Sequence, residues 1–169
     1  MRIAVAFAAA AAITLAAASS QAVSAASAKG PSLQDCVDAV ALNCTTAKLD
    51  GIDLSGRELA DANFEAAFLG GAKFVGADLT YANFQVVVAE GVDFSGAKLV
   101  YAPMFASFFK NAKFVGADLS GANLARAVLE GADLTGAKLD RTELLGARLG
   151  GAKWIDGRVC KAGSITTCE

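Results

Sequence analysis

The sequence predicts an all-β solenoid, a rod of short stacked coils, and three observations carry that prediction. The octet AKFVGADL stands at 72–79 and again at 112–119. Residues 68–107 match residues 108–147 at 19 of 40 positions. Every fifth residue from Leu49 to Val159 forms a register of 23 positions without an insertion, of which thirteen are Leu and six are Phe. Such an internal period is typical of repeat architectures.

The repeating unit has five residues. Ala stands two places before the central residue in 16 of the 23 units, and Gly stands two places after it in 12. A period of five fits neither an α-helix nor a flat alternating strand, so each unit is interpreted as one short straight side followed by a corner. Strand side chains alternate, and therefore the Ala and the central Leu or Phe of one unit both point inward.

These units, such as ADLTG at 132–136 and AKFVG at 72–76, resemble the A(D/N)LXX motif of the pentapeptide repeat family. The resemblance covers 47–161, most of the chain, in unbroken register. It implies a right-handed quadrilateral parallel β-helix with four units, or twenty residues, in each coil. The octet would then recur two coils apart, at the same corner of the rod.

The first 28 residues have the pattern of a signal peptide. Arg2 provides a positive start, Ala4–Ala18 is an apolar run, and Ala26-Ser27-Ala28 is one of several small-residue cleavage points. The alternative is an N-terminal membrane anchor, although the run is shorter than the ~20 residues that a span needs. We expect an exported protein without a stable membrane span after cleavage. The periplasm is preferred, and the thylakoid lumen or secretion are the alternatives.

Four cysteines stand in two pairs, each pair eight positions apart, one near either end of the repeat. In an exported chain an even number of cysteines suggests disulfides. Three connectivities are possible, the two local ones are favoured, and four free thiols are the alternative. We expect residues 29–46 to form an N-terminal cap with a short helix, and 162–169 to form a C-terminal tail or cap. The cysteines are Cys36, Cys44, Cys160 and Cys168.

Twenty residues per coil place the outward residues in vertical columns. One column alternates in sign, which stabilises neighbouring strands and indicates a solvated structural ladder. It reads Asp53, Lys73, Asp93, Lys113, Asp133, Lys153. A second, shorter ladder is expected from Glu90, Lys110 and Glu130. Another column, Asn63, Asn83 and Asn123, is expected to bond backbone near the corners.

The adjacent side carries an apolar stripe, which is the candidate functional site. Two interpretations stay open: a protein-contact or dimer face, or a side that tolerates β-formers or is covered by the cap or the tail. The stripe consists of Phe68, Val88, Phe108 and Val128 between Lys48 and Arg148, with Val86, Phe105 and Leu145 around the corner. Tyr81 and Tyr101 stack at a different corner, as packing residues or as a planar-ligand site.

The composition excludes several classes of function. The chain has no His and no CxxC motif, and a convex rod has no dry cleft, so we expect no catalytic residues, no metal site and no cofactor. The net charge of −2 offers no basic footprint for nucleic acid. We expect a non-enzymatic, exported interaction scaffold with a protein partner or a second copy. The alternative, from the resemblance, is a DNA mimic that binds a topoisomerase such as gyrase.

Overall fold

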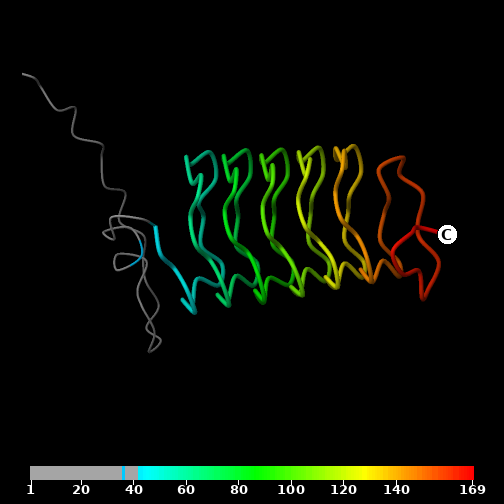
Figure 1. Ribbon diagram of the computed structural model, residues 1–169, viewed down its shortest axis with the longest axis horizontal. Coiled ribbons are helices and arrows are strands. Elements are labelled where there is room, and N and C mark those ends of the chain that lie inside the picture. Colours follow the sequence, from blue (N-terminus) through cyan, green and yellow to red (C-terminus); the bar gives the residue numbers. More distant parts are fainter. Residues whose placement is uncertain (1–35, 37–41) are drawn as a thin grey trace, which may run out of the picture.

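The computed structural model describes residue 36 and residues 42–169, and these form one rod of stacked coils (Figure 1). Parallel bridges join residues twenty apart, from Asn43 with Asn63 to Asp133 with Lys153. Each bridge is a single residue, and among the described residues 42–169 no helix or longer strand is delimited. The predicted coil length of twenty residues is therefore confirmed. We number the coils one (43–62) to six (143–162).

Backbone hydrogen bonds connect each coil to both neighbours. In the coil that holds Asp78 and Leu79, the Leu79 N–H donates to the Lys98 carbonyl at 2.8 Å, and the Asp78 N–H donates to the Arg57 carbonyl at 3.0 Å. Within the coil, the Ala77 N–H closes its corner on the Phe74 carbonyl at 3.1 Å. A side of only three residues therefore satisfies its polar backbone without a long strand.

The corners explain why Gly recurs in the unit. From Thr46 to Gly151, the residue two places after each central position has a φ between 53° and 72°. This left-handed region suits Gly, which has no Cβ. Val86, with a φ of 57°, is the exception that matters most, because a β-branched residue is a conformational outlier there.

The interior is a stack of the central residues. From Leu49 to Leu134 every central residue is buried, as are most of the Ala residues two places earlier. Phe rings twenty residues apart stack in parallel, with centroids 5.0 Å apart for Phe64 and Phe84 and 5.1 Å apart for Phe74 and Phe94. Rings of adjacent units meet edge to face, as Phe64 and Phe74 do at 5.5 Å. The inward placement predicted for these positions is confirmed.

The five-residue register ends before Val159, which corrects the prediction there. Trp154 is half-buried, and Val159 is 62% exposed. The chain reverses after Trp154. The Trp154 N–H donates to the Arg158 carbonyl at 2.8 Å, and Val159 pairs antiparallel with Lys153. A second antiparallel bridge joins Ile165 to Arg148. The tail thus adds a reversed layer to two sides of the last coil.

One of the two predicted disulfides is present. Cys160 and Cys168 are bonded with an S–S distance of 2.08 Å, and both are buried at the C-terminal end of the rod. This bond closes the loop 160–168 that carries Ile165. At the other end, Cys44 retains its thiol in this structure and hydrogen-bonds with Cys36. Burial, reinforced by Cys36, raises the pKa of the Cys44 thiol.

The predicted signal peptide at 1–28 lies outside the described residues, as does the predicted capping helix apart from Cys36 and 42–46. Both stay predictions. The predicted Cys36–Cys44 disulfide is not formed in this structure, where Cys44 keeps its thiol. Within the described part of the chain there is no helix long and apolar enough to cross a membrane.

Candidate protein-contact face

The apolar stripe forms one vertical column, as the coil length requires. Bridges connect Lys48 to Phe68, Phe68 to Val88, Val88 to Phe108, Phe108 to Val128, and Val128 to Arg148. We call this column, with Val86, Phe105 and Leu145 at the preceding corner, the apolar face. Neighbouring side chains in the column stand about 4.8 Å apart, which is the inter-strand spacing.

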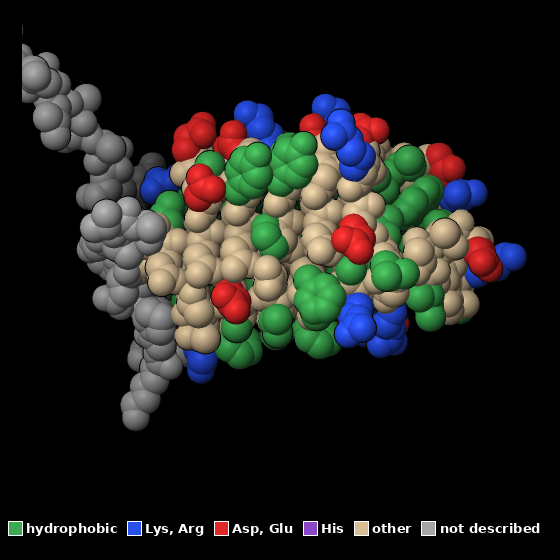
Figure 2. Space-filling model, in the orientation of Figure 1, with side chains coloured by type: hydrophobic (Ala, Val, Ile, Leu, Met, Phe, Trp, Pro, Cys, Tyr) green, Lys and Arg blue, Asp and Glu red, His purple; other side chains and the backbone are tan. Residues whose placement is uncertain are grey.

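The exposed side chains of this face are large. Phe68 is 41% exposed, Phe108 49% and Val86 50%, and Val88 and Leu145 also face solvent. Two predicted members are less open: Val128 is half-buried, and Phe105 lies under the Arg126 guanidinium, 5.8 Å from the ring centroid. Figure 2 shows one side of the rod, on which hydrophobic side chains lie between separate acidic and basic groups.

The tail does not cover the apolar face. Ile165 pairs beside Arg148, so it continues the column by one further residue, and it is itself 58% exposed. The predicted alternative in which the tail folds over the stripe is therefore wrong for the described residues 160–169. The alternative in which the cap covers it concerns residues that are not described.

A buried hydroxyl shapes the corner of this face, and the sequence analysis did not single it out. Ser107 occupies an inward position that Ala usually holds, and its hydroxyl donates to the Phe84 carbonyl at 2.6 Å. The same oxygen accepts the Val87 N–H at 3.3 Å. It thereby replaces the direct bond that closes most other corners, at the corner where Val86 is exposed. A Ser in a column of Ala was the available signal.

The ladder on the next side is built differently, although its backbone is the same. Lys113 pairs with Asp93 at 3.3 Å and Lys153 pairs with Asp133 at 3.1 Å. Each Asp also accepts a backbone N–H two residues ahead, as Asp133 does from Thr135 at 3.0 Å. The predicted alternation of this column is confirmed by its bridges.

Hydrogen bonds hold the aspartates ionised. The Thr80 hydroxyl and N–H, followed by Lys98, lower the pKa of Asp78, and Ser55 does the same for the pKa of Asp53. The Asn column works in the same way without charge: Asn63, Asn83 and Asn123 accept the N–H groups of Glu65, Gln85 and Ala125. Its predicted role at the corners is confirmed.

The second short ladder is not formed as predicted. Glu130 pairs with Arg148 instead of Lys110. Among residues 42–169, neither Glu90 nor Lys110 makes an ion pair within the chain, and Glu65 makes none either. These three charges border the apolar face on its two corners.

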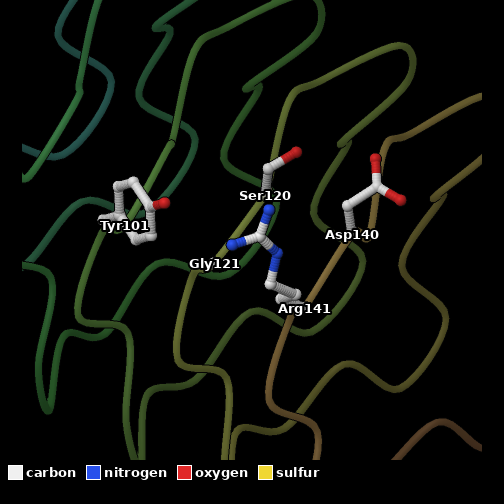
Figure 3. Close-up of a pocket in the computed structure, with 5 residues that line it drawn as sticks. All are labelled: Tyr101, Ser120, Gly121, Asp140 and Arg141. Carbon is white, nitrogen blue, oxygen red and sulfur yellow. The ribbon is translucent and has the colours of Figure 1, made fainter.

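The tyrosine stack is present as predicted. Tyr81 and Tyr101 have ring centroids 5.4 Å apart and planes inclined by 11°. Tyr101 lies against Gly121, where an added Cβ would meet the ring at 2.4 Å. Beyond it is an open hollow of about 350 Å³ lined by Tyr101, Ser120, Gly121, Asp140 and Arg141 (Figure 3). Whether this corner binds a planar ligand stays a prediction.

Within the described part of the chain, no group of three or more Cys, Asp or Glu side chains converges to hold a metal ion. The carboxylates lie on the outer surface, and several of them pair with Lys or Arg.

Comparisons with known proteins agree with this geometry. The family model for pentapeptide repeats matches eight copies, within residues 58–96, 109–141 and 117–153. The pentapeptide repeat protein Rfr23 from the cyanobacterium Cyanothece 51142 is 25% identical with a TM-score of 0.61, over 62% of this chain and 85% of that chain. HetL from Nostoc sp. strain PCC 7120, a pentapeptide repeat protein involved in heterocyst differentiation regulation, is 28% identical with a TM-score of 0.54. That match covers 71% of this chain and 62% of HetL.

More distant matches add little. One structure of QnrB1, a plasmid-mediated fluoroquinolone resistance protein, is 19% identical with a TM-score of 0.33, too low to favour a shared function. No curated protein matches the sequence. The coil of twenty residues, the matching repeats and the solved relatives show that the chain belongs to the pentapeptide repeat family.

Proposed function

We propose that this pentapeptide repeat protein is an exported, non-enzymatic scaffold that binds protein through its apolar face. The exposed column Phe68, Val88 and Phe108 is the observation that carries the proposal. Large aromatic side chains in a contiguous exposed patch are typical of a protein-contact site. The rest of the repeat shows that exposed apolar columns are not a requirement of the fold, because the ladder side carries Asp and Lys at the same positions.

The rigidity of the rod supports a scaffold function. Every coil is bonded to its neighbours, so the exposed rings are held on a fixed backbone and lose little conformational freedom on binding. The strained corner at Val86 keeps one more apolar side chain on this surface, where Gly would cost less.

Export is supported by two independent features. The first is the signal-like sequence at 1–28. The second is the Cys160–Cys168 disulfide, because such bonds persist in oxidising compartments. A DNA mimic would need a predominantly acidic rod, but four of the column aspartates are paired with lysines here, namely Asp78, Asp93, Asp118 and Asp133.

The contact function can be tested by crosslinking the protein in its own cells. We expect crosslinked species of the wild type to disappear in the double variant Phe68→Lys/Phe108→Lys, because two charges would be buried without partners. The matched control is Lys73→Ser/Lys113→Ser, which changes the same two coils on the ladder side and should leave the species in place. Species that persist in the first variant would show that the apolar face is not the contact.

Export is tested separately by the N-terminal sequence of the native protein. We expect cleavage near Ala28, leaving Lys29 or a neighbour as the first residue. A native chain that still begins at Met1 would contradict the signal peptide.

A further inference from the structure

We propose that the occupant of the apolar face is a second copy of this chain, bound antiparallel in a single register. This inference rests on the proposed contact function, and it names the partner. The two corners that border the face carry Glu65, Glu90, Lys110 and Arg126, none of which makes an ion pair within the described part of the chain.

The regular coils reduce the possible arrangements to a few. If two copies join these faces about a two-fold axis perpendicular to the rods, each corner meets the same corner of the partner with the coil order reversed. An axis that passes between coils three and four sets coil three against coil four, coil two against coil five, and coil one against coil six. An axis at coil three or coil four shifts every pairing by one coil.

The corner that follows the apolar column selects one of these registers. It carries Glu90 in coil three, Lys110 in coil four and Glu130 in coil five. With the axis between coils three and four, Glu90 of each copy faces Lys110 of the other. With the axis at coil three, Glu90 faces Glu90, and with the axis at coil four, Lys110 faces Lys110. Like charges across an interface suppress a register, and opposite charges favour one.

The corner that precedes the apolar column selects the same register independently. Glu65 lies there in coil two, and Arg126 lies there in coil five. Coil two faces coil five only when the axis lies between coils three and four. Both side chains are exposed, and Arg126 lies over the Phe105 ring at the border of the face. Two different corners therefore agree on one register.

The apolar column is complementary in this arrangement. Phe108 faces Val88, and Phe68 faces Val128, so each large ring meets a smaller side chain. Val86 likewise faces Ala106 across the corner. At the ends Lys48 meets Arg148, whose charge is already paired with Glu130. A parallel dimer sets the following corner against the preceding corner of the same coil, so Glu90 faces Val86 and Lys110 faces Ala106, and only Glu130 meets an opposite charge, Arg126. It is therefore less favourable than the antiparallel register.

The size of the face predicts a weak dimer. Six coils at about 4.8 Å, each with a three-residue side between two corners, outline a face of roughly 29 by 16 Å when both corners are included. Two such faces bury on the order of 900 Å², about three quarters of the ~1,200 Å² at the lower limit of standard specific interfaces. We therefore expect self-association in the micromolar range rather than a permanent dimer.

Sedimentation equilibrium of the protein, produced in its source organism so that processing is native, tests the register by charge exchange. Glu90→Lys should weaken the dimer about tenfold or more, and Lys110→Glu should do the same, because each variant makes two like-charge contacts per dimer. The double variant Glu90→Lys/Lys110→Glu should return to within about threefold of the wild type. Glu143→Lys, the same charge change on a different side, is the control that should leave the affinity unchanged.

The outcomes separate this inference from the proposed function. A wild-type protein that stays monomeric at about 1 mM overturns the dimer. A dimer whose dissociation constant is unchanged by Glu90→Lys and by Lys110→Glu must form through another surface. This result also overturns the proposed register. If the protein is monomeric while crosslinked species still depend on Phe68 and Phe108, the contact function stands and only the second copy is wrong. Circular dichroism of each variant verifies that the coils remain folded.

Discussion

The ladder side and the apolar side of this rod share one backbone and one core, yet their surfaces differ. Both follow the same twenty-residue bridges, and both lie over buried Leu and Phe. On the ladder side, Asp93 and Lys113 satisfy each other and nearby hydroxyls. On the apolar side, Phe68 and Phe108 have solvent as their outer neighbour. The coil therefore decides where a side chain stands, and the outward residue alone decides whether a side is charged and paired or apolar and exposed.

The buried corner bond under the apolar side gives the largest expected effect. Ser107→Ala leaves the Val87 N–H and the Phe84 carbonyl without their buried partner, and we expect a loss of about 1–3 kcal/mol in the free energy of unfolding. Denaturant unfolding measures it. Ala112→Ser places the same hydroxyl under the ladder side, at the Val92 corner of the coil below, which the Val92 N–H already closes on the Ala89 carbonyl, so it should gain no comparable bond. If Ser107→Ala cost nothing, the hydroxyl would not be what holds this corner.

The strain at Val86 gives an intermediate effect of opposite sign. Val86→Gly relieves a left-handed β-branched residue, and we expect the free energy of unfolding to rise by about 1 kcal/mol. Gly96→Val introduces the same strain at an open corner on the other border of the ladder, with a φ of 66°, and should lower stability by about as much. Thermal unfolding compares the two. Val86→Gly should nevertheless weaken self-association. A variant that gains both unfolding stability and self-association affinity would contradict a role for Val86 on the apolar face.

Substitutions in the ladders should give the smallest changes in the free energy of unfolding. Comparing Asn with Ala at one Asp separates the ion pair from the hydrogen bonds in the turn. Asp78→Asn keeps the acceptor for Thr80 and loses only the exposed pair with Lys98, so it should cost at most about 0.5 kcal/mol. Asp78→Ala also loses the bonds from Thr80 and should cost about 1 kcal/mol. Equal losses for Asn and Ala would show that the ion pair, not the turn bond, matters.

The pH dependence of the free energy of unfolding tests the contribution of the ionised carboxylates. The pKa values of Asp53, Asp78, Asp93, Asp118 and Asp133 are lowered in the folded chain. Their contribution is therefore fully present above the unfolded pKa of about 3.9 and is lost as the pH falls through the lower folded values. We expect a flat unfolding free energy above about pH 5 and a decline below about pH 4. A decline that begins near neutral pH would contradict this assignment.

The positions of the repeat could be predicted from the sequence because one period governs them. Leu119 and Phe114 are buried, and the column from Lys48 to Arg148 is bridged as expected. The prediction failed at Val159, because nothing in the five-residue register shows where the chain reverses. It also missed Ser107, since a single Ser among Ala residues does not reveal which carbonyl it meets. The second ladder failed because Arg148 reaches Glu130 from another column.

The sequence by itself determined the coil length, the inward residues and the make-up of each column, because a strict period in a stacked coil leaves no freedom in register. Only the tertiary structure decided which charges pair, where the rod closes and how much of each apolar side chain stays exposed. Those outcomes depend on side-chain reach between columns and on the reversed tail held by Cys160 and Cys168, which are distances in space that a linear period does not encode.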